Sequence, residues 1–342
     1  MKNKKKIYDI VFVCSFFVIC LLPLKNVTDV NSLDQNFWGR DLLIKTFQSI
    51  RLGIGDQVFE KSIRTDDNWL IYTGEISIQD YQNTIPLNEN QLETIHTNLQ
   101  TLDDFLQSKG ISLVVVIPPN KNTIYPEHMP DEIPVIGEIS RLDQVIDYQN
   151  GHNGVEILDL RQSLWNAKKL QQVYYSTDTH WNLYGAYIAY EEIINALHEQ
   201  FPNLNPYPLA NFEFLFQGNS GGDLETTANI NIAEEQYQLK FSNLDYVNIE
   251  EVIYAYNADK TSKPTVTTFI NNDETLPDVF IYHDSFSDNL KYYLPLNFHK
   301  TTFLYHLYND LEFAQIESED PDVLILEFTE RYLAFLLYKL PE

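Results

Sequence analysis

The sequence predicts an α/β fold in which helices alternate with buried, parallel strands. The first observation is a helical stripe of apolar residues over 92–106, which Gly110 ends in the manner of a C-cap. A continuous apolar run over 111–117 follows, of the kind that is buried on both faces of a parallel sheet. The second observation is that this order repeats, with a helical pattern over 139–146 and a short strand over 155–160. Helix followed by buried strand is half of a doubly wound unit, so a helix-covered parallel sheet is expected.

The N-terminal segment is hydrophobic and follows a cluster of lysines. Residues 1–6 carry four lysines, and the eighteen mostly apolar residues 7–24 are just long enough to cross a bilayer. Because the lysines precede the apolar span, the positive-inside rule predicts a cytoplasmic N-terminus with the rest of the chain outside the cytoplasm. A cleaved signal peptide is the alternative, but residues 22–25 offer no small-residue cleavage site. We therefore expect a single-pass anchor in residues 1–24, with 7–24 in the membrane.

The next segment is expected to connect the membrane to the domain. Residues 25–64 form this juxtamembrane segment, and the apolar positions within 36–54 predict a helix there. A turn cluster and an aromatic-rich strand signal follow over 65–72. We place the start of the main domain at residue 65, and we expect this domain to run to residue 342.

The alternation continues along the second half of the chain, with one interruption. A short helical piece near 164–170 precedes a polar and aromatic run, and a long helix over 183–197 follows with Asn182 placed to cap it. Residues 203–275 contain prolines, glycines and short alternating pieces, which indicate an irregular insertion with β-structure. Regular alternation then returns, with strands predicted at 279–282, 301–305 and 323–328 and helices at 288–294, around 307–313 and at 330–340.

The composition supports a large folded domain and excludes several kinds of partner and site. Of the 342 residues, 44% are hydrophobic, which is enough to bury a sizeable core. The net charge is −26, or −29 without residues 1–24, so the chain repels phosphate backbones and nucleic acid is not an expected partner. Both cysteines, Cys14 and Cys20, lie in the apolar span. This excludes a disulfide framework, a cysteine nucleophile and a thiolate metal site from the remaining residues.

Two polar groups stand where the ligand crevice of such a sheet is expected. Ser285 follows the predicted strand 279–282, and ligands of open parallel sheets bind outside the carboxyl ends of the strands. The helix predicted after it would supply N–H groups and positive potential to a developing oxyanion, which suits a nucleophile. Asp178 and His180 lie two residues apart in the loop before the helix 183–197. There the carboxylate can orient the imidazole for proton abstraction.

Each of these groups also has another interpretation. Serine is a good helix cap, so Ser285 would need no further role. A histidine among aromatic residues, such as His180, is often packed and hydrogen-bonded without a catalytic role. Asp178 would then only cap a turn. A metallohydrolase is a third interpretation, because His283 and Asp284 could join Asp178 and His180 as hard ligands.

Two motifs carry a resemblance to a known family. The runs 176–182, followed by Gly185, and 284–287 read STDTHWN and DSFS. They resemble the SGNH-hydrolase-like family of the alginate O-acetylation proteins AlgX and AlgJ. Further similar runs occur in the expected order at 67–72, 116–121, 125–126, 222–224 and 330–331. The resemblance therefore spans residues 67–331, nearly all of the chain after the N-terminal segment.

The resemblance implies a fold and a role for each motif residue. It implies a flavodoxin-like α/β/α sandwich in circularly permuted order, since the serine follows the Asp–His pair. It also implies that Ser285 is the acyl-accepting nucleophile, His180 its base and Asp178 the orienting carboxylate. In the family, a membrane-bound O-acyltransferase is thought to supply the acetyl group, which leaves on a polysaccharide hydroxyl. No cofactor and no metal are implied.

The sequence departs from the family at one position, and the oxyanion donors stay open. The residue before Asp284 is commonly glycine in the family, whereas here it is His283, whose side chain would either crowd the turn or supply a donor. The N–H of Ser285 is the natural first oxyanion donor. Tyr292 or Tyr293 is a candidate second donor, and Trp181 a candidate substrate contact.

These observations predict a serine O-acetyltransferase or esterase that acts outside the cytoplasm on a cell-surface or exported polysaccharide. The expected mechanism is a double displacement through an acyl-serine intermediate. The alternative is a catalytically inactive protein of the same fold that binds carbohydrate or acts as a scaffold in polysaccharide export. The 22 tyrosines and the His283 departure motivate that alternative.

Overall fold

The computed structural model describes residues 39–241, 249–254, 266–306, 310–338 and 340. The predicted anchor over 1–24 and the start of the juxtamembrane segment lie outside these residues. Within the described ranges, none of the helices combines the length and the apolar content that a bilayer crossing requires.

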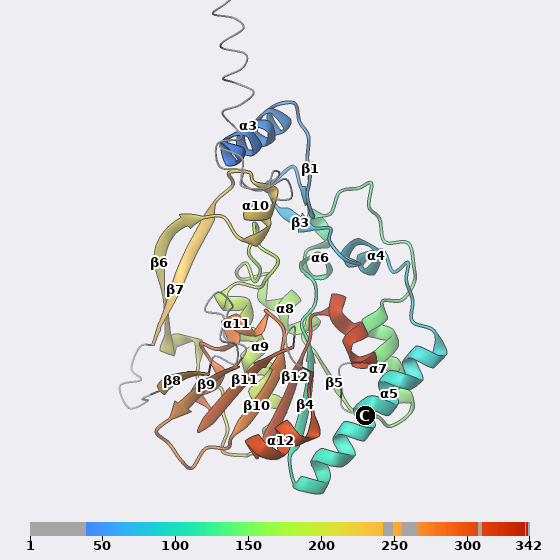
Figure 1. The fold of residues 1–342 in the computed structure, drawn as a ribbon, viewed down its shortest axis with the longest axis vertical. Helices are drawn as coiled ribbons and strands as arrows, with labels where there is room; N and C mark the ends of the chain where they lie inside the picture. Colours follow the sequence, from blue (N-terminus) through green and yellow to red (C-terminus); the bar gives the residue numbers. More distant parts are fainter. Residues whose placement is uncertain (1–38, 242–248, 255–265, 307–309, 339, 341–342) are drawn as a thin grey trace, which may run out of the picture.

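A seven-stranded sheet forms the centre of the domain (Figure 1). Its strand order is β5-β4-β12-β10-β11-β9-β8. The first five strands are parallel, β9 pairs antiparallel with β11, and β8 pairs antiparallel with β9. The strands are β4 (Ser112–Ile117), β5 (Ile157–Asp159), β8 (Ile249–Tyr254), β9 (Val266–Asn271), β10 (Val279–His283), β11 (Lys300–Tyr305) and β12 (Val323–Glu327). The predicted α/β class is confirmed, and a parallel strand of the sheet lies in each of the five predicted strand regions 111–117, 155–160, 279–282, 301–305 and 323–328.

Helices cover both faces of this sheet, because alternate residues of each buried strand point to opposite sides. On one face Val114, Ile281 and Ile325 pack with helix α9 (Leu183–Ala196). On the other face the neighbouring strand positions pack with α5 (Glu89–Lys109), α7 (Arg141–Gly151) and the 3-10 segment η6 (Glu330–Leu337). The chain thus has three layers, with the mixed sheet between two helical layers.

Local signals account for where the main helices begin and end. Helix α5 starts with a capping box on Asn88 and stops at Gly110, whose φ of 77° is the left-handed conformation that glycine adopts readily. Helix α9 starts at Asn182, whose side chain accepts the Gly185 N–H at 2.9 Å, as the sequence predicts. Shorter helices lie between the strands: α6 (Lys121–Ile124), η3 (Pro126–His128), α8 (Arg161–Ala167) and α11 (Ser287–Leu290).

Three helical predictions in the C-terminal part differ in their limits. The pattern over 288–294 divides into α11 and η5 (Leu294–Leu296), because Pro295 has no N–H with which to continue an α-helix. Of the helix expected around 307–313, residues 307–309 lie outside the described residues. The described helix that follows is α12 (Phe313–Glu319), where Glu312 and Gln315 form a capping box. The last predicted helix is the 3-10 segment η6.

A smaller unit precedes the first strand of the main sheet. Helix α3 (Arg40–Gly53) lies within the predicted 36–54 helix, and its residues are partly or fully exposed. It is followed by a three-stranded antiparallel sheet and a short helix: β1 (Val58–Phe59), β2 (Ser62–Arg64), β3 (Leu70–Tyr72) and α4 (Ser77–Tyr81). Phe59 and Leu70 pack with helix α10 (Asp223–Ala228), so this unit is joined to the region that follows α9.

The region expected to be an insertion, 203–275, has two parts. The first contains η4 (Leu209–Asn211) and the antiparallel hairpin of β6 (Phe212–Ser220) and β7 (Glu234–Phe241), with α10 between the two strands. Figure 1 shows this hairpin along one flank of the domain. The second part, β8 and β9, does not stand outside the fold, because it pairs with β11 and extends the central sheet.

Candidate active site

The two predicted polar groups meet at the carboxyl edge of the central sheet. Ser285 comes two residues after the end of β10 and two before α11. His180 lies in the loop before α9, which is closed by an isolated antiparallel bridge between Tyr174 and Trp181. We call residues 174–181 the base loop. Residues more than a hundred positions apart in the chain therefore form one site.

The side chains of Ser285, His180 and Asp178 form a continuous hydrogen-bond chain. Ser285 Oγ lies 2.7 Å from His180 Nε2, and it donates to this nitrogen when the ring is neutral, because Nδ1 then carries the proton that faces Asp178. The other ring nitrogen, Nδ1, lies 2.6 Å from Asp178 Oδ1 and donates to it. The same carboxylate oxygen accepts the backbone N–H of His180 at 2.9 Å. This is the geometry of a serine activated by a base that a carboxylate orients.

Asp178 stabilises the protonated form of the His180 imidazole. Burial acts to lower the pKa of His180, but the hydrogen bond and charge of Asp178 outweigh it and raise the pKa above the usual value. For Asp178, burial acts to raise the pKa of the carboxyl, yet the contacts with His180 lower it well below its usual range. Asp178 therefore stays ionised and stabilises the imidazolium that forms when His180 takes a proton.

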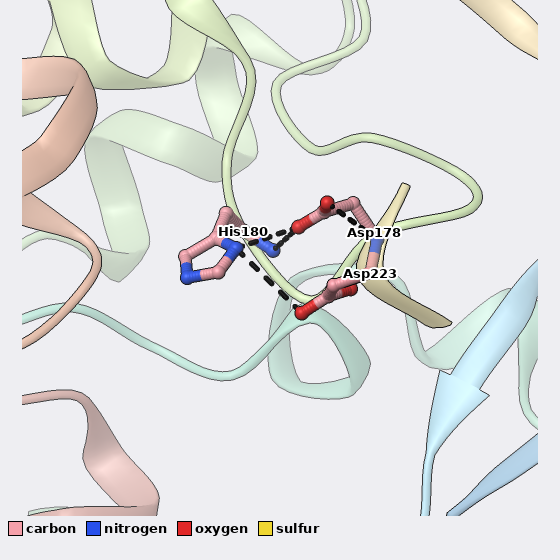
Figure 2. Close-up of side chains that lie close together, drawn as sticks. All are labelled: Asp178, His180 and Asp223. Atoms are coloured by element: carbon pink, nitrogen blue, oxygen red, sulfur yellow. Dashed lines mark hydrogen bonds and ion pairs between the residues drawn. The ribbon is translucent and has the colours of Figure 1, made fainter. Parts of the chain in front are cut away.

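Asp223 is a third member of this cluster that the sequence did not single out (Figure 2). Its Oδ2 lies 3.9 Å from His180 Nδ1, and its backbone N–H donates to Asp178 Oδ2 at 2.8 Å. The N–H and hydroxyl of Thr179 donate to its carboxylate at 2.8 and 2.6 Å. The approach requires glycine at 222, because a Cβ there would lie 2.4 Å from the Asp178 Cβ. In the sequence, 222–224 is only a family motif without a role.

The metal interpretation required His283 and Asp284 beside the Asp–His pair, and the structure does not place them there. Asp284 turns its carboxylate to the N–H of Phe286 and to the N–H and hydroxyl of Thr329. Among the described residues, the group whose ligand atoms are close enough to hold a cation is instead Asp178, His180 and Asp223. The four-residue set of the metal interpretation is therefore not formed by the described residues.

His283 is a core residue and not an oxyanion donor. It occupies the last position of β10, where it pairs with Tyr305 and Glu327, and it is not among the described residues with positive φ. Its Nδ1–H donates to the Asp284 carbonyl at 2.6 Å, and burial lowers the pKa of the ring to about 4. A side chain in place of the family glycine therefore fits this extended position without crowding the turn.

Two predicted aromatic contacts are structural. Trp181 is fully buried, and its indole N–H donates to the carbonyl of Phe286 at 2.9 Å. Tyr293 is also fully buried, and its hydroxyl donates to the Leu183 carbonyl at 2.7 Å. Their polar atoms are thus used inside the protein. Tyr292 is 45% exposed, so it is the predicted tyrosine that a substrate can reach.

The backbone around Ser285 leaves one donor free for an oxyanion. Among the described residues, the N–H of Ser285 has no hydrogen-bond acceptor, whereas the N–H of Phe286 is taken by Asp284. The turn rests on β12 through Glu327, whose carboxyl accepts from the Ser287 hydroxyl at 2.8 Å. Complete burial and the nearby charge of Asp284 raise the pKa of Glu327 well above its usual value.

Two buried cationic side chains, Lys121 and Arg331, contact the segments that carry the site. The ammonium of Lys121 donates to the carbonyls of Tyr175, Ser176 and Asp178 at 3.2, 3.2 and 2.6 Å, and burial lowers its pKa to about 8. The Arg331 side chain is 7% exposed, and its guanidinium lies 5.4 Å from the ring centre of Phe286. Neither role is readable from the sequence, where both residues occur only within motifs of the family resemblance.

Comparisons with known proteins agree with this site. Residues 63–300 match the family described as SGNH hydrolase-like domain, acetyltransferase AlgX. The probable alginate O-acetylase AlgJ of Pseudomonas syringae pv. tomato (strain ATCC BAA-871 / DC3000) is 30% identical over 173 residues. These residues are 51% of this chain and 40% of that protein, so the chain spans less than half the length of this relative.

Solved structures show the same fold at low identity. PatB1 of Bacillus cereus, solved with a sulfonyl adduct, has a TM-score of 0.58 at 16% identity, over 82% of this chain and 97% of that one. The O-acetyltransferase domain of Pseudomonas putida AlgJ has a TM-score of 0.51 at 18% identity, over 80% of this chain and 93% of that one. Because the matched family region covers more than half of the chain, this protein belongs to the SGNH hydrolase-like acetyltransferase AlgX family.

Proposed function

We propose that this protein is a serine O-acetyltransferase or esterase that acts on a polysaccharide outside the cytoplasm. The observation that carries the proposal is the hydrogen-bond chain from Ser285 through His180 to Asp178, with 2.7 and 2.6 Å between the bonded atoms. Membership of the AlgX family supports the same reaction class, and the relative named above is a probable alginate O-acetylase.

The reaction proceeds in two displacements. Ser285 Oγ attacks the carbonyl carbon of the acyl donor while His180 Nε2 takes the hydroxyl proton, and Asp178 stabilises the resulting imidazolium. The oxyanion accepts a hydrogen bond from the Ser285 N–H, and Tyr292 stays the candidate second donor. The leaving group departs with the proton from His180. A sugar hydroxyl or water then attacks the acyl carbon of the acyl-serine and gives its proton to His180 Nε2. His180 passes that proton to Ser285 Oγ as the bond from Oγ to the acyl carbon breaks and the new ester or acetate leaves.

The proposed location and partners of the reaction rest on the sequence and on the family resemblance. Residues 7–24 anchor the chain, and the domain from 65 to 342, with its insertion at 203–275, stands outside the cytoplasm. A membrane-bound O-acyltransferase is the proposed source of the acetyl group, and a polysaccharide is its acceptor. The chemistry needs neither a cofactor nor a metal ion, since the nucleophile, base and orienting carboxylate are all side chains.

The test is the loss of acyl turnover when the nucleophile is removed. Purified full-length protein should release p-nitrophenol from p-nitrophenyl acetate, and Ser285→Ala should abolish this release. Mass spectrometry of the acid-quenched wild type should find an acetyl group on the Ser285 peptide. The matched control is Ser49→Ala on the exposed helix α3, which should keep wild-type turnover. Full activity in Ser285→Ala would refute the proposal, and glycan binding without turnover in the wild type would favour the inactive binding protein.

A further inference from the structure

A cleft lies directly beside the base loop, and its walls come from two parts of the chain. One wall includes Tyr175 and Ser176, which lie shortly before Asp178 in the base loop, and the other is the hairpin β6–β7 with Phe214 and Tyr237. Its volume is about 350 Å³, which lies in the range of about 300–1,000 Å³ for small-molecule sites. We infer that this cleft binds the acetyl acceptor and selects an uncharged glycan chain. The inference rests on the proposed function.

The hairpin presents one aromatic face that becomes more exposed along its length. The directly paired positions are Phe212 with Phe241, Phe214 with Leu239, and Phe216 with Tyr237, so their side chains share a face. Phe212 is 6% exposed, whereas Phe216 is 56% and Tyr237 39% exposed. The rings of Phe216 and Tyr237 lie 5.8 Å apart. Exposed aromatic surface of this kind marks a binding site, and it suits the apolar C–H faces of sugar rings.

Both ends of this face are fixed to the domain, so the aromatic rings are held in place. At one end the Phe212 ring packs on the rings of Tyr187 and Tyr293 in the core beneath α9. At the other end Glu234 accepts hydrogen bonds from the backbone and hydroxyl groups of Ser176 and Thr177 in the base loop. The hairpin is therefore joined to the same loop that positions His180.

The charges of the cleft select against an anionic polymer. Its charged lining residues are two carboxylates, Glu234 and Glu235, and no lysine or arginine lines it. A polyuronate carries a carboxylate on each sugar, so it would meet like charge here without a cationic partner. The net charge of −26 acts in the same direction. The relatives named as alginate O-acetylases thus differ in acceptor from what this cleft accommodates.

Glu234, the carboxylate next to the base loop, has its acceptor positions occupied and offers no direct contact to a cationic glycan. Glu234 already accepts from four donors of the base loop, and Glu235 accepts the hydroxyl of Tyr237. Glu234 thus joins the hairpin to the base loop, whereas Glu235 bonds within its own strand. A chain of hydroxyl-bearing sugars satisfies both features of the cleft, because it stacks on aromatic rings and needs no counter-charge.

The transfer step needs only two side chains that are already described, Ser285 and His180. A hydroxyl of the bound sugar attacks the carbonyl carbon of acetyl-Ser285 and gives its proton to His180 Nε2. The bond from Oγ to the acetyl carbon breaks, and His180 returns a proton to Oγ. The products are the sugar acetate and the free serine.

The test offers the full-length protein three hexasaccharides with p-nitrophenyl acetate as donor. One is neutral (β-1,4-linked glucose), one anionic (mannuronate) and one cationic (glucosamine). Mass spectrometry should find acetyl groups on the neutral hexamer at a rate at least tenfold above the other two. Equal or faster acetylation of the mannuronate or glucosamine hexamer would overturn the inference. Hydrolysis of the donor without transfer to the neutral hexamer would overturn it too, while leaving the esterase proposal intact.

Direct binding separates the cleft from the chemistry. Calorimetry should detect binding of the neutral hexamer, with no heat from the mannuronate hexamer. Tyr237→Ala should weaken that binding and lower the ratio of transfer to hydrolysis at least tenfold. The control Tyr338→Ala removes an exposed tyrosine far from the cleft residues in the sequence and should change neither quantity. Glu235→Lys should increase mannuronate binding. Absence of neutral-hexamer binding in the wild type would refute the inference even if the protein hydrolyses no ester.

Discussion

Asp223 is expected to tune the base, although it would touch neither the substrate nor the serine. The substitution Asp223→Asn removes one negative charge and keeps an oxygen that can accept the Thr179 N–H. The backbone N–H that Asp223 donates to Asp178 is unaffected by the side-chain change. The variant thus isolates the electrostatic effect of a second carboxylate placed 3.9 Å from His180 Nδ1.

The size of the effect follows from that distance. Two unit charges at about 4 Å interact by about 1 kcal/mol in water and about 4 kcal/mol in a partly buried setting. The Asp223 side chain is 43% exposed, so solvent screening brings the value to the lower end. A loss of about 1 kcal/mol lowers the pKa of His180 by about 0.7. The same loss of imidazolium stabilisation reduces kcat/KM on the pH plateau about fivefold.

The measurement is the pH profile of kcat/KM for p-nitrophenyl acetate between pH 5 and 8. The acid limb should move to lower pH by about 0.7 in Asp223→Asn, so the two profiles should converge at the acidic end. Glu225→Gln is the matched control, because it removes a charge from the same helix α10 and does not act on His180. An acid limb that stays in place, or that moves to higher pH, would show that this reasoning is wrong.

Two further predictions concern the support of the site. Trp181→Phe removes the indole donor to the buried Phe286 carbonyl, and leaving that carbonyl unpaired should lower the free energy of unfolding by about 1–3 kcal/mol. Chemical denaturation measures this, and a change below about 0.5 kcal/mol would contradict it. For Glu327→Gln, the raised pKa means that wild-type stability is complete below the unfolded pKa and falls as pH rises towards the folded one. The variant lacks this loss, so its stability advantage should grow by up to about 1.4 kcal/mol per pH unit above pH 5. Equal pH slopes for both proteins would refute the raised pKa of Glu327.

The elements that were predictable are those with local signals. The continuous apolar runs of β4, β10 and β12 have the composition of strands buried on both faces, and Gly110 and Asn182 are local helix signals. Strands β8 and β9 were not recognised as part of the sheet. Their place depends on pairing with β11, a contact that neither strand's own pattern encodes.

Within the site, too, some features have local sequence signals and others depend on tertiary contacts. The proximity of Ser285 and His180 could be expected, because each lies in a loop at the same edge of a parallel sheet. The burial of Trp181, Tyr293 and His283 could not, since it depends on which elements pack over them. The role of Asp223 could not be predicted either. Asp223 lies 45 residues after Asp178 in the sequence, and only the fold of the 221–223 turn brings the two residues together.

The strand order has a consequence for how the chain acquires its structure. Strand β12 lies between β4 and β10, and it is the last strand in the sequence. Until residues 323–327 are available, β4 with β5 and β10 with β11, β9 and β8 form two separate fragments, each with an unpaired apolar edge. We therefore expect the sheet to form completely only after almost the whole chain has been synthesised. Interrupted synthesis or C-terminal proteolysis should leave a product prone to aggregation.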